Sequence, residues 1–326
     1  MEVSHNRRPA DQGANIPQLG SSMTELVGDT PVVKLAKVVP EGAADIFVKL
    51  EWFNPTGSYK DRMALAIIEE AERRGDLRPG MTVVEYTGGS TGSSLAFVCA
   101  VKGYRFKVVS SDAFAPEKLK TMQAFGAELT IVPSEGGVIT PDLIPRMVEK
   151  AKELAAEPGT YFTDQFRNRD ALSGYRRAGQ ELLGQIGRPI DVFCAGVGTG
   201  GFSMGVSTAF REAGAGTRVV LLEPASSAVI STGVAGGHRV EGIGVGFLPP
   251  LLDESLYHEV RAIDEDEARV MAGRLAAEEG LLTGISSGLN VVAAIGLARE
   301  MGPGHVVATV AVDTGLKYLA GDLFAI

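Results

Sequence analysis

Apolar residues along the 326-residue chain fall into two alternating patterns. Short, nearly continuous apolar runs bounded by glycine, proline or polar residues predict buried strands, and longer runs with apolar residues at helical spacing predict helices. The expected strands are 46–50, 82–86, 106–110, 128–132, 191–195, 219–223 and 305–312. The expected helices are 62–74, 91–102, 117–125, 143–156, 170–185, 201–213, 265–279 and 287–300. Such alternation predicts an α/β protein with largely parallel sheet covered by helices on both faces.

The strand–helix units repeat in two groups, which predicts two lobes. One group runs from about residue 53 to 160 and the other from about 163 onward, with the turn formers Pro158 and Gly159 between them. Residues 1–21 contain no apolar core of a secretory signal, so we expect a flexible N-terminal extension. No apolar stretch reaches the roughly 20 residues that span a bilayer. We therefore expect a cytoplasmic protein without a membrane segment.

The charge, cysteine and histidine content argue against nucleic-acid binding, a disulfide and a metal site. The formal net charge is −9 and no cluster of Lys and Arg stands out, so the sequence disfavours nucleic-acid binding. Cys99 and Cys194 each lie inside an apolar segment, which favours buried, reduced thiols over a disulfide or a metal site. The four histidines are scattered and show no metal-ligand spacing.

Lys60 is the most informative single residue. It follows the turn formers Asn54-Pro55-Thr56-Gly57-Ser58 and precedes a run of helical spacing that ends at Gly75. A cation in the first turn of a helix is disfavoured by about 0.3–1 kcal/mol because of the helix dipole. The alternative is a solvated surface lysine. The position suits an amine that must be neutral and nucleophilic, as in a Schiff base.

A glycine turn supplies a second candidate site. The expected strand near 191–197 runs into Gly198-Thr199-Gly200-Gly201-Phe202-Ser203 and then into a helix. This order of elements presents backbone N–H groups to a phosphate, although a simple tight turn is the alternative. The spacing matches neither the dinucleotide fingerprint nor the P-loop. A lysine for an aldehyde and a turn for a phosphate together suggest pyridoxal 5′-phosphate (PLP).

These segments resemble the cysteine synthase (O-acetylserine sulfhydrylase) family, related to cystathionine β-synthase, among fold-type II PLP enzymes. The resemblance runs from about Leu26 to Leu323 through six motifs in the family's order: 54–62, 84–92, 164–166, 198–201, 241–247 and 284–288. It implies a fold like that of the tryptophan synthase β subunit. That fold has two open, twisted, mostly parallel sheets flanked by helices, with PLP in the cleft between the domains. It further implies a large PLP-binding domain of residues 22–52 plus 161–326 and a small substrate-loop domain of residues 53–160.

The resemblance also assigns roles to residues. It implies that Lys60 is catalytic and forms the Schiff base. The other implied cofactor contacts are Ser90, Gly198, Thr199, Gly200, Gly201, Phe202 and Ser286, and the implied substrate contacts are Thr87, Gly88, Gly89, Thr91, Gln165 and Gly242. Ser286 is expected to bond the pyridine nitrogen, and a neutral hydroxyl there favours β-elimination chemistry over racemisation or transamination. Thr91 and Ser286 could alternatively be helix N-caps, and Gln165 an ordinary polar loop residue.

Three positions depart from the family pattern. Phe202 stands where the family usually has Thr, Gly88 where it has Ser, and Ser90 where it has Asn.

The expected reaction is β-replacement on a serine- or cysteine-type amino acid through an α-aminoacrylate, as in cysteine synthase, with sulfide or another nucleophile. The alternatives are elimination of the desulfhydrase or serine/threonine dehydratase type, synthesis of a non-protein amino acid, and a non-catalytic PLP-binding protein. The expected partners are a small amino-acid substrate and a second copy of the chain in a homodimer.

Overall fold

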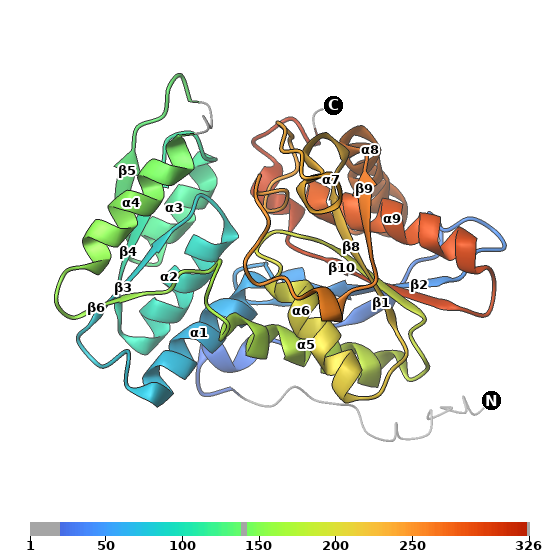
Figure 1. The fold of residues 1–326 in the computed structure, drawn as a ribbon, viewed down its shortest axis with the longest axis horizontal. Coiled ribbons are helices and arrows are strands. Elements are labelled where there is room, and N and C mark those ends of the chain that lie inside the picture. The colour runs from blue at the N-terminus through green and yellow to red at the C-terminus, as the bar shows by residue number, and fades with distance from the viewer. Residues whose placement is uncertain (1–19, 138–141, 325–326) are drawn as a thin grey trace, which may run out of the picture.

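The computed structural model describes residues 20–137 and 142–324, so the expected extension at 1–21 lies almost wholly outside the described residues. Two sheets form the framework (Figure 1). The larger sheet has the order β1 (Val32–Lys34), β2 (Asp45–Leu50), β10 (Val306–Ala311), β7 (Val192–Gly196), β8 (Arg218–Pro224) and β9 (Glu259–Ile263). The smaller sheet has the order β5 (Glu128–Val132), β4 (Arg105–Ser111), β3 (Thr82–Tyr86) and β6 (Thr160–Phe162). Every strand pair is parallel except β1 with β2.

Helices cover both faces of each sheet. The helices are α1 (Lys60–Arg74), α2 (Ser90–Lys102), α3 (Pro116–Ala124), α4 (Leu143–Ala155), α5 (Ala171–Ile186), α6 (Gly201–Glu212), α7 (Val229–Thr232), α8 (Glu265–Arg274) and α9 (Ile285–Met301). A π-helical turn covers Leu275–Glu279, and short 3₁₀ turns cover Met23–Leu26, Glu51–Phe53, Ala225–Ser227, Glu254–Leu256 and Gly315–Tyr318. In the described ranges no helix is long and apolar enough to cross a membrane.

Alternating side chains of the strands divide the core into separate clusters. In β7, Val192 and Cys194 pack against α8 and α9, whereas Phe193 and Ala195 face α5 and α6. In the smaller sheet, Val83 belongs to the cluster with α1 and α2. The next residue, Val84, packs toward α4. Period-two alternation with apolar residues on both faces is the signature of a parallel sheet buried on both sides. The predicted α/β class and the two flanked, mostly parallel sheets are confirmed.

Differences from the predicted elements concern mainly the sheet edges. The sequence pattern missed β1, β6 and β9, and each of these is the outermost strand of a sheet. Two of them have only three residues, so their apolar pattern is too short to recognise. The helix expected at 265–279 is α8 followed by the π-helical turn. The domain boundaries near residues 52 and 160 stay a prediction.

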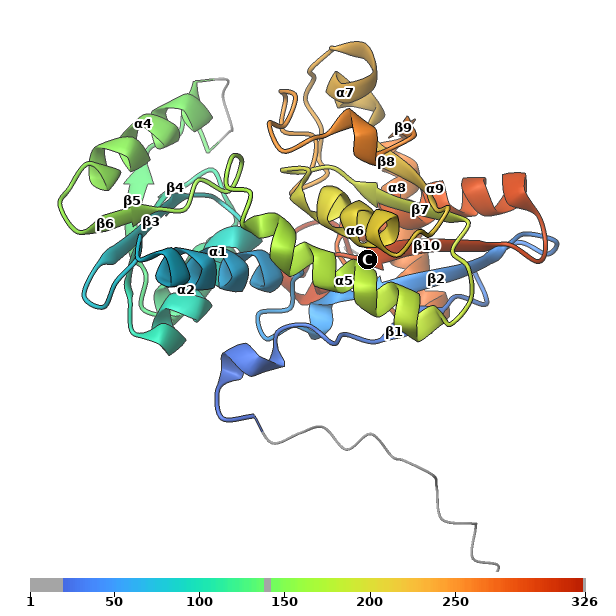
Figure 2. The same ribbon diagram turned by 60° about the horizontal axis from the view of Figure 1, so that its bottom comes forward.

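A buried ionic network fixes the start of α1 between the two sheets. Figure 2 shows α1 at the junction of the sheets, between α2 and α5. The Arg62 guanidinium donates to both carboxylate oxygens of Glu51 and of Glu181, at 2.6–2.9 Å. Lys49 Nζ lies 2.6 Å from Glu181. Asp61 accepts from the backbone N–H and the hydroxyl of Thr56. Arg62 and Asp61 therefore stabilise the start of α1.

Candidate active site

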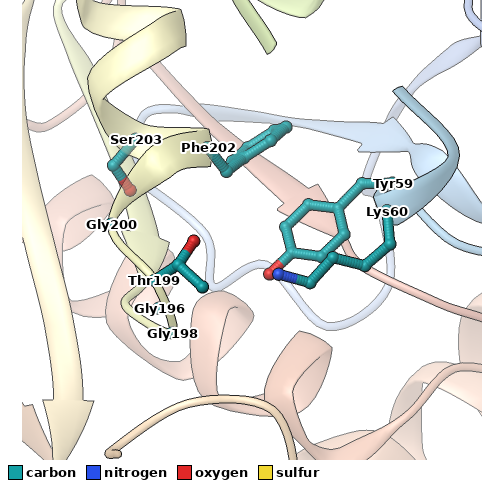
Figure 3. Close-up of a pocket in the computed structure, with 8 residues that line it drawn as sticks. All are labelled: Tyr59, Lys60, Gly196, Gly198, Thr199, Gly200, Phe202 and Ser203. Carbon is teal, nitrogen blue, oxygen red and sulfur yellow. The ribbon is translucent and has the colours of Figure 1, made fainter. Parts of the chain in front are cut away.

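Lys60 is the first residue of α1 and lines a small pocket with the glycine turn (Figure 3). The wall consists of Tyr59, Lys60, Gly196, Gly198, Thr199, Gly200, Phe202 and Ser203. The segment before Lys60 is tied to the end of β10, since the Tyr59 N–H donates to the Val312 carbonyl at 3.1 Å. Tertiary structure thus brings together two motifs that lie about 140 residues apart in sequence.

The Lys60 amine is buried and unpaired. Its residue is 8% exposed, and in the described part of the chain its Nζ has no hydrogen-bond or ion-pair partner. Burial lowers the pKa of Lys60 to about 8, and the carboxylate of Glu85 opposes that shift. The Tyr59 ring lies near it, 5.0 Å from Nζ to the centroid. A neutral amine is a nucleophile and a base, so Lys60 can react with an aldehyde and accept a proton near neutral pH.

The glycine turn has the geometry of an anion site. Gly200 has φ +82°, and a Cβ at Gly198 would lie less than 3.0 Å from the Gly242 carbonyl oxygen. These two positions therefore require glycine. The turn leads into α6, whose first N–H groups have no intrahelical acceptor. The Ser203 hydroxyl is buried and has no partner in the described chain, and it faces this pocket. Within the described residues, the Gly201 N–H donates only to the Thr199 hydroxyl, at 3.4 Å, and an unpaired buried hydroxyl beside N–H groups of a helix N-terminus suits a phosphate.

The expected substrate loop lies between β3 and α2. The Gly89 N–H donates to the Thr87 hydroxyl at 3.1 Å, and the Thr91 hydroxyl donates to Gln165 Oε1 at 2.7 Å. Gly89 is the N-cap of α2, so the alternative that Thr91 is the N-cap is wrong. Ser90 accepts from Lys317 Nζ at 3.2 Å. The structure places Thr87, Gly88, Gly89, Ser90, Thr91 and Gln165 together at the N-terminus of α2.

Gly88 is a steric requirement of this chain. A Cβ there would come within 3.0 Å of three ring carbons of Phe114, whereas ordinary contacts are 3.4–4 Å. The aromatic ring therefore occupies the space that a Ser at position 88 would need. Phe114 follows β4 and belongs to the loop before α3. Sequence reasoning identified the unusual glycine and missed the residue that explains it.

Glu85 is a site residue that sequence reasoning missed altogether. It lies in β3, is fully buried, and accepts hydrogen bonds from the Thr163 hydroxyl and from the Tyr86 and Gln165 N–H groups at 2.7–3.0 Å. Burial raises the pKa of Glu85 to about 7. The available signal was one acidic residue inside the apolar run Thr82-Val-Val-Glu-Tyr86. Its carboxyl group holds the strand end next to the loop that carries Gln165.

Ser286 and Asp313 lie where three segments meet. Ser286 is the second residue of α9 and is buried, but the N-cap of α9 is Gly284, so Ser286 is not the cap. Ser58 pairs with Asp313 as an isolated bridge, which joins the approach to Lys60 to the end of β10. One Asp313 oxygen accepts from the Tyr318 hydroxyl at 2.7 Å, and burial raises the pKa of Asp313. Ser286 does not belong to the wall of the pocket in Figure 3.

Comparisons with known proteins agree with this site. The family of pyridoxal-phosphate dependent enzymes matches residues 23–313. A cysteine synthase of Staphylococcus aureus (strain Mu50 / ATCC 700699) is 42% identical over 306 residues, 93% of this chain and 97% of that protein. The crystal structure of cysteine synthase from Entamoeba histolytica has a TM-score of 0.89 at 30% identity and covers 98% of this chain and 95% of its own. That of O-ureido-L-serine synthase has a TM-score of 0.87 at 38% identity, covering 94% and 96%.

The pocket residues fit the two reactive ends of PLP. Lys60 offers a desolvated amine for the aldehyde. The turn offers N–H groups and the orphaned Ser203 hydroxyl for the phosphate. Family, fold and donor set therefore agree. The chain belongs to the pyridoxal-phosphate dependent enzymes, within them to the cysteine synthase-like group, and its cofactor is pyridoxal 5′-phosphate.

Proposed function

We propose that the protein catalyses β-replacement on an activated serine, with O-acetyl-L-serine as substrate and sulfide or another nucleophile as the second reactant. The observation that carries the proposal is the unpaired Lys60 amine beside an anion-binding glycine turn. The 42% identity to a cysteine synthase over nearly the whole chain supports the substrate class.

Lys60, the glycine turn and Ser286 are the proposed cofactor contacts. Lys60 holds the aldehyde carbon, and Gly198, Thr199, Gly200, Gly201 and Phe202 offer backbone N–H groups to the phosphate. We assign the ring nitrogen to the buried Ser286 hydroxyl. Ser90 stands at the start of α2 and receives a hydrogen bond from Lys317. We therefore propose that the Ser90 hydroxyl contacts the cofactor while Lys317 donates a hydrogen bond to the same hydroxyl. The cleft between the two sheets is the proposed location of the cofactor.

When bound, PLP withdraws electrons from Cα of the amino acid, which makes its proton acidic and lets the β-substituent leave. Once the substrate's α-amine has displaced Lys60 from the aldehyde carbon, the freed Lys60 amine would take that proton from Cα, and acetate would depart from Cβ with the electron pair of the C–O bond. The nucleophile then forms its bond at Cβ, and Lys60 returns the proton to Cα. A pKa of about 8 keeps a useful fraction of Lys60 neutral at neutral pH, as proton transfer in both directions requires.

The loop at the start of α2 is the proposed binding site for the substrate carboxylate. Its Thr87, Gly88, Gly89 and Thr91 bring N–H and hydroxyl groups to the helix N-terminus, where negative charge is favoured. Gln165 already pairs with Thr91, and its backbone is held by Glu85. Gly242 contacts the glycine turn through its carbonyl group, and we propose that its loop closes the other side of the substrate site.

A second candidate is β-replacement with a nucleophile other than sulfide, giving a non-protein amino acid. Two observations favour it. Phe114 fills the space above Gly88, which changes the shape of the substrate loop. A structure that is 38% identical belongs to an O-ureido-L-serine synthase, whose name describes a serine with an O-linked group. Release of the β-eliminated product as keto acid and ammonia remains the third outcome to be measured.

The decisive experiment combines product analysis with mapping of the reactive lysine. Purified protein is incubated with O-acetyl-L-serine and sulfide, and cysteine, acetate, pyruvate and ammonia are quantified. Borohydride reduction followed by peptide mapping identifies the lysine that carries the cofactor, which we expect to be Lys60. Lys60→Ala should lose the visible absorbance and the activity. Lys102→Ala, which removes a half-buried lysine paired with Glu72 and outside the pocket wall, should keep both.

Label on another lysine would contradict the assignment of Lys60. Formation of pyruvate and ammonia without cysteine would show that the reaction is elimination and not β-replacement.

For assembly and location we propose a cytoplasmic homodimer, supported by exposed apolar side chains at Met23, Leu26 and Phe53 that a second copy could cover. Light scattering that gives a single chain mass would exclude the dimer.

A further inference from the structure

Tyr59 is a pocket residue that neither the motifs nor the relatives assign. It immediately precedes Lys60, and its side chain is one of the largest groups in the pocket wall (Figure 3). The figure shows its hydroxyl end directed into the pocket, toward the side where the glycine turn lies. The residue is 5% exposed. In the described part of the chain, no group forms a hydrogen bond with the Tyr59 hydroxyl.

Packing holds the Tyr59 ring in this position. Its centroid lies 4.9 Å from that of Phe202 and 5.6 Å from that of Tyr175, both in tilted arrangements. The Phe202 ring in turn packs edge-on against Tyr175 at 5.3 Å. The Tyr59 N–H is bonded to β10. Because ring and backbone are both fixed, the hydroxyl cannot turn away to solvent and must find a partner inside the pocket.

The chemistry of the hydroxyl favours an anionic partner. Burial, together with the negative charges of Asp313 and Glu51, raises the pKa of Tyr59, so the phenol remains a hydrogen-bond donor. When protonated, Lys60 Nζ is itself a donor and cannot accept a hydrogen bond from the Tyr59 hydroxyl. When neutral, it is the group that reacts with the aldehyde of PLP. The phosphate group is the strongest acceptor that PLP brings into the pocket.

Phe202 explains why such a donor is needed. It is the second residue of α6, directly after the last glycine of the turn, and its side chain has no polar atom. Instead of meeting a phosphate, its ring supports Tyr59. We propose that the Tyr59 hydroxyl donates a hydrogen bond to the phosphate of bound PLP and supplies the side-chain donor that Phe202 lacks. This inference rests on the proposed function of the pocket as the PLP site.

The test separates the phosphate from the rest of the cofactor. Apoprotein of the wild type and of Tyr59→Phe is titrated with PLP and with pyridoxal, which has the same ring and aldehyde but no phosphate. Tyr59→Phe should raise the Kd for PLP by roughly 10- to 100-fold, the effect of one hydrogen bond to a charged group. The Kd for pyridoxal should stay the same. Circular dichroism verifies that the variant is folded.

Tyr175→Phe is the matched control. It also removes a buried phenol hydroxyl without a partner, on a ring that touches Tyr59 and Phe202 but lies outside the pocket wall. Its PLP-to-pyridoxal affinity ratio should equal that of the wild type. Equal loss of affinity for both ligands in Tyr59→Phe, or no loss for either, overturns the inference. If borohydride still labels Lys60 in that variant, the proposed function stands even when the inference about Tyr59 fails.

Discussion

The Phe114 ring beside Gly88 makes a quantitative prediction about the substrate loop. Gly88→Ser restores the residue that the resembling family carries, yet its Cβ would come within 3.0 Å of three Phe114 ring carbons. Either the ring or the loop must move, and overpacking of this kind costs about 1–3 kcal/mol. Phe114 is only half-buried, so part of the strain can be relieved toward solvent. Strain that displaces the loop lowers kcat/KM by about 5- to 140-fold, since about 1.4 kcal/mol corresponds to tenfold.

The assay is a double-mutant cycle on kcat/KM for O-acetyl-L-serine and on the melting temperature. Gly88→Ser should lose activity and a few degrees of Tm, and adding Phe114→Ala should restore most of both. Gly89→Ser in the same loop is the stability control, because a Cβ at Gly89 meets nothing within 4 Å and its φ is −131°. Additive effects of Gly88→Ser and Phe114→Ala would refute the steric reasoning. So would an equal Tm loss in Gly89→Ser.

Four further predictions concern charge and backbone. Folding lowers the Lys60 pKa from 10.5 to about 8, so the rate of PLP capture by apoprotein should rise with pH up to about 8 and then level, measured by absorbance. Because the unfolded chain binds the extra proton between those values, apoprotein stability should also rise with pH from about 8 to 10.5, and Lys60→Ala should remove this slope. Arg62→Met leaves the buried Glu51 carboxylate without its ion-pair partner and should cost about 3–5 kcal/mol in urea unfolding, against less than about 1 kcal/mol for Arg74→Met on the surface. Gly200→Asp adds negative charge to the turn and strain at φ +82°. It should therefore weaken PLP binding, measured by equilibrium dialysis, far more than Ser286→Ala does. Equal losses of affinity in the two variants would mean that the turn does not bind the phosphate.

The buried strands, the main helices and the two cofactor motifs could be predicted from the sequence because they depend on local rules. The apolar run of β7, the glycine turn after it and the position of Lys60 at a helix start are each determined by neighbours in the chain. The edge strands could not be predicted in this way. β1 and β6 have three residues each, and their partner strands rather than their own residues stabilise them.

The sequence by itself therefore determined the α/β class, the cofactor chemistry and the candidate lysine. Only the tertiary structure decided which side chains surround that lysine. Phe114 beside Gly88, Phe202 behind Tyr59, and Glu85 beneath Gln165 are contacts between residues far apart in the chain. The physical reason is that side-chain periodicity shows which face of an element is buried, whereas the neighbours on that face depend on how sheets and helices pack together.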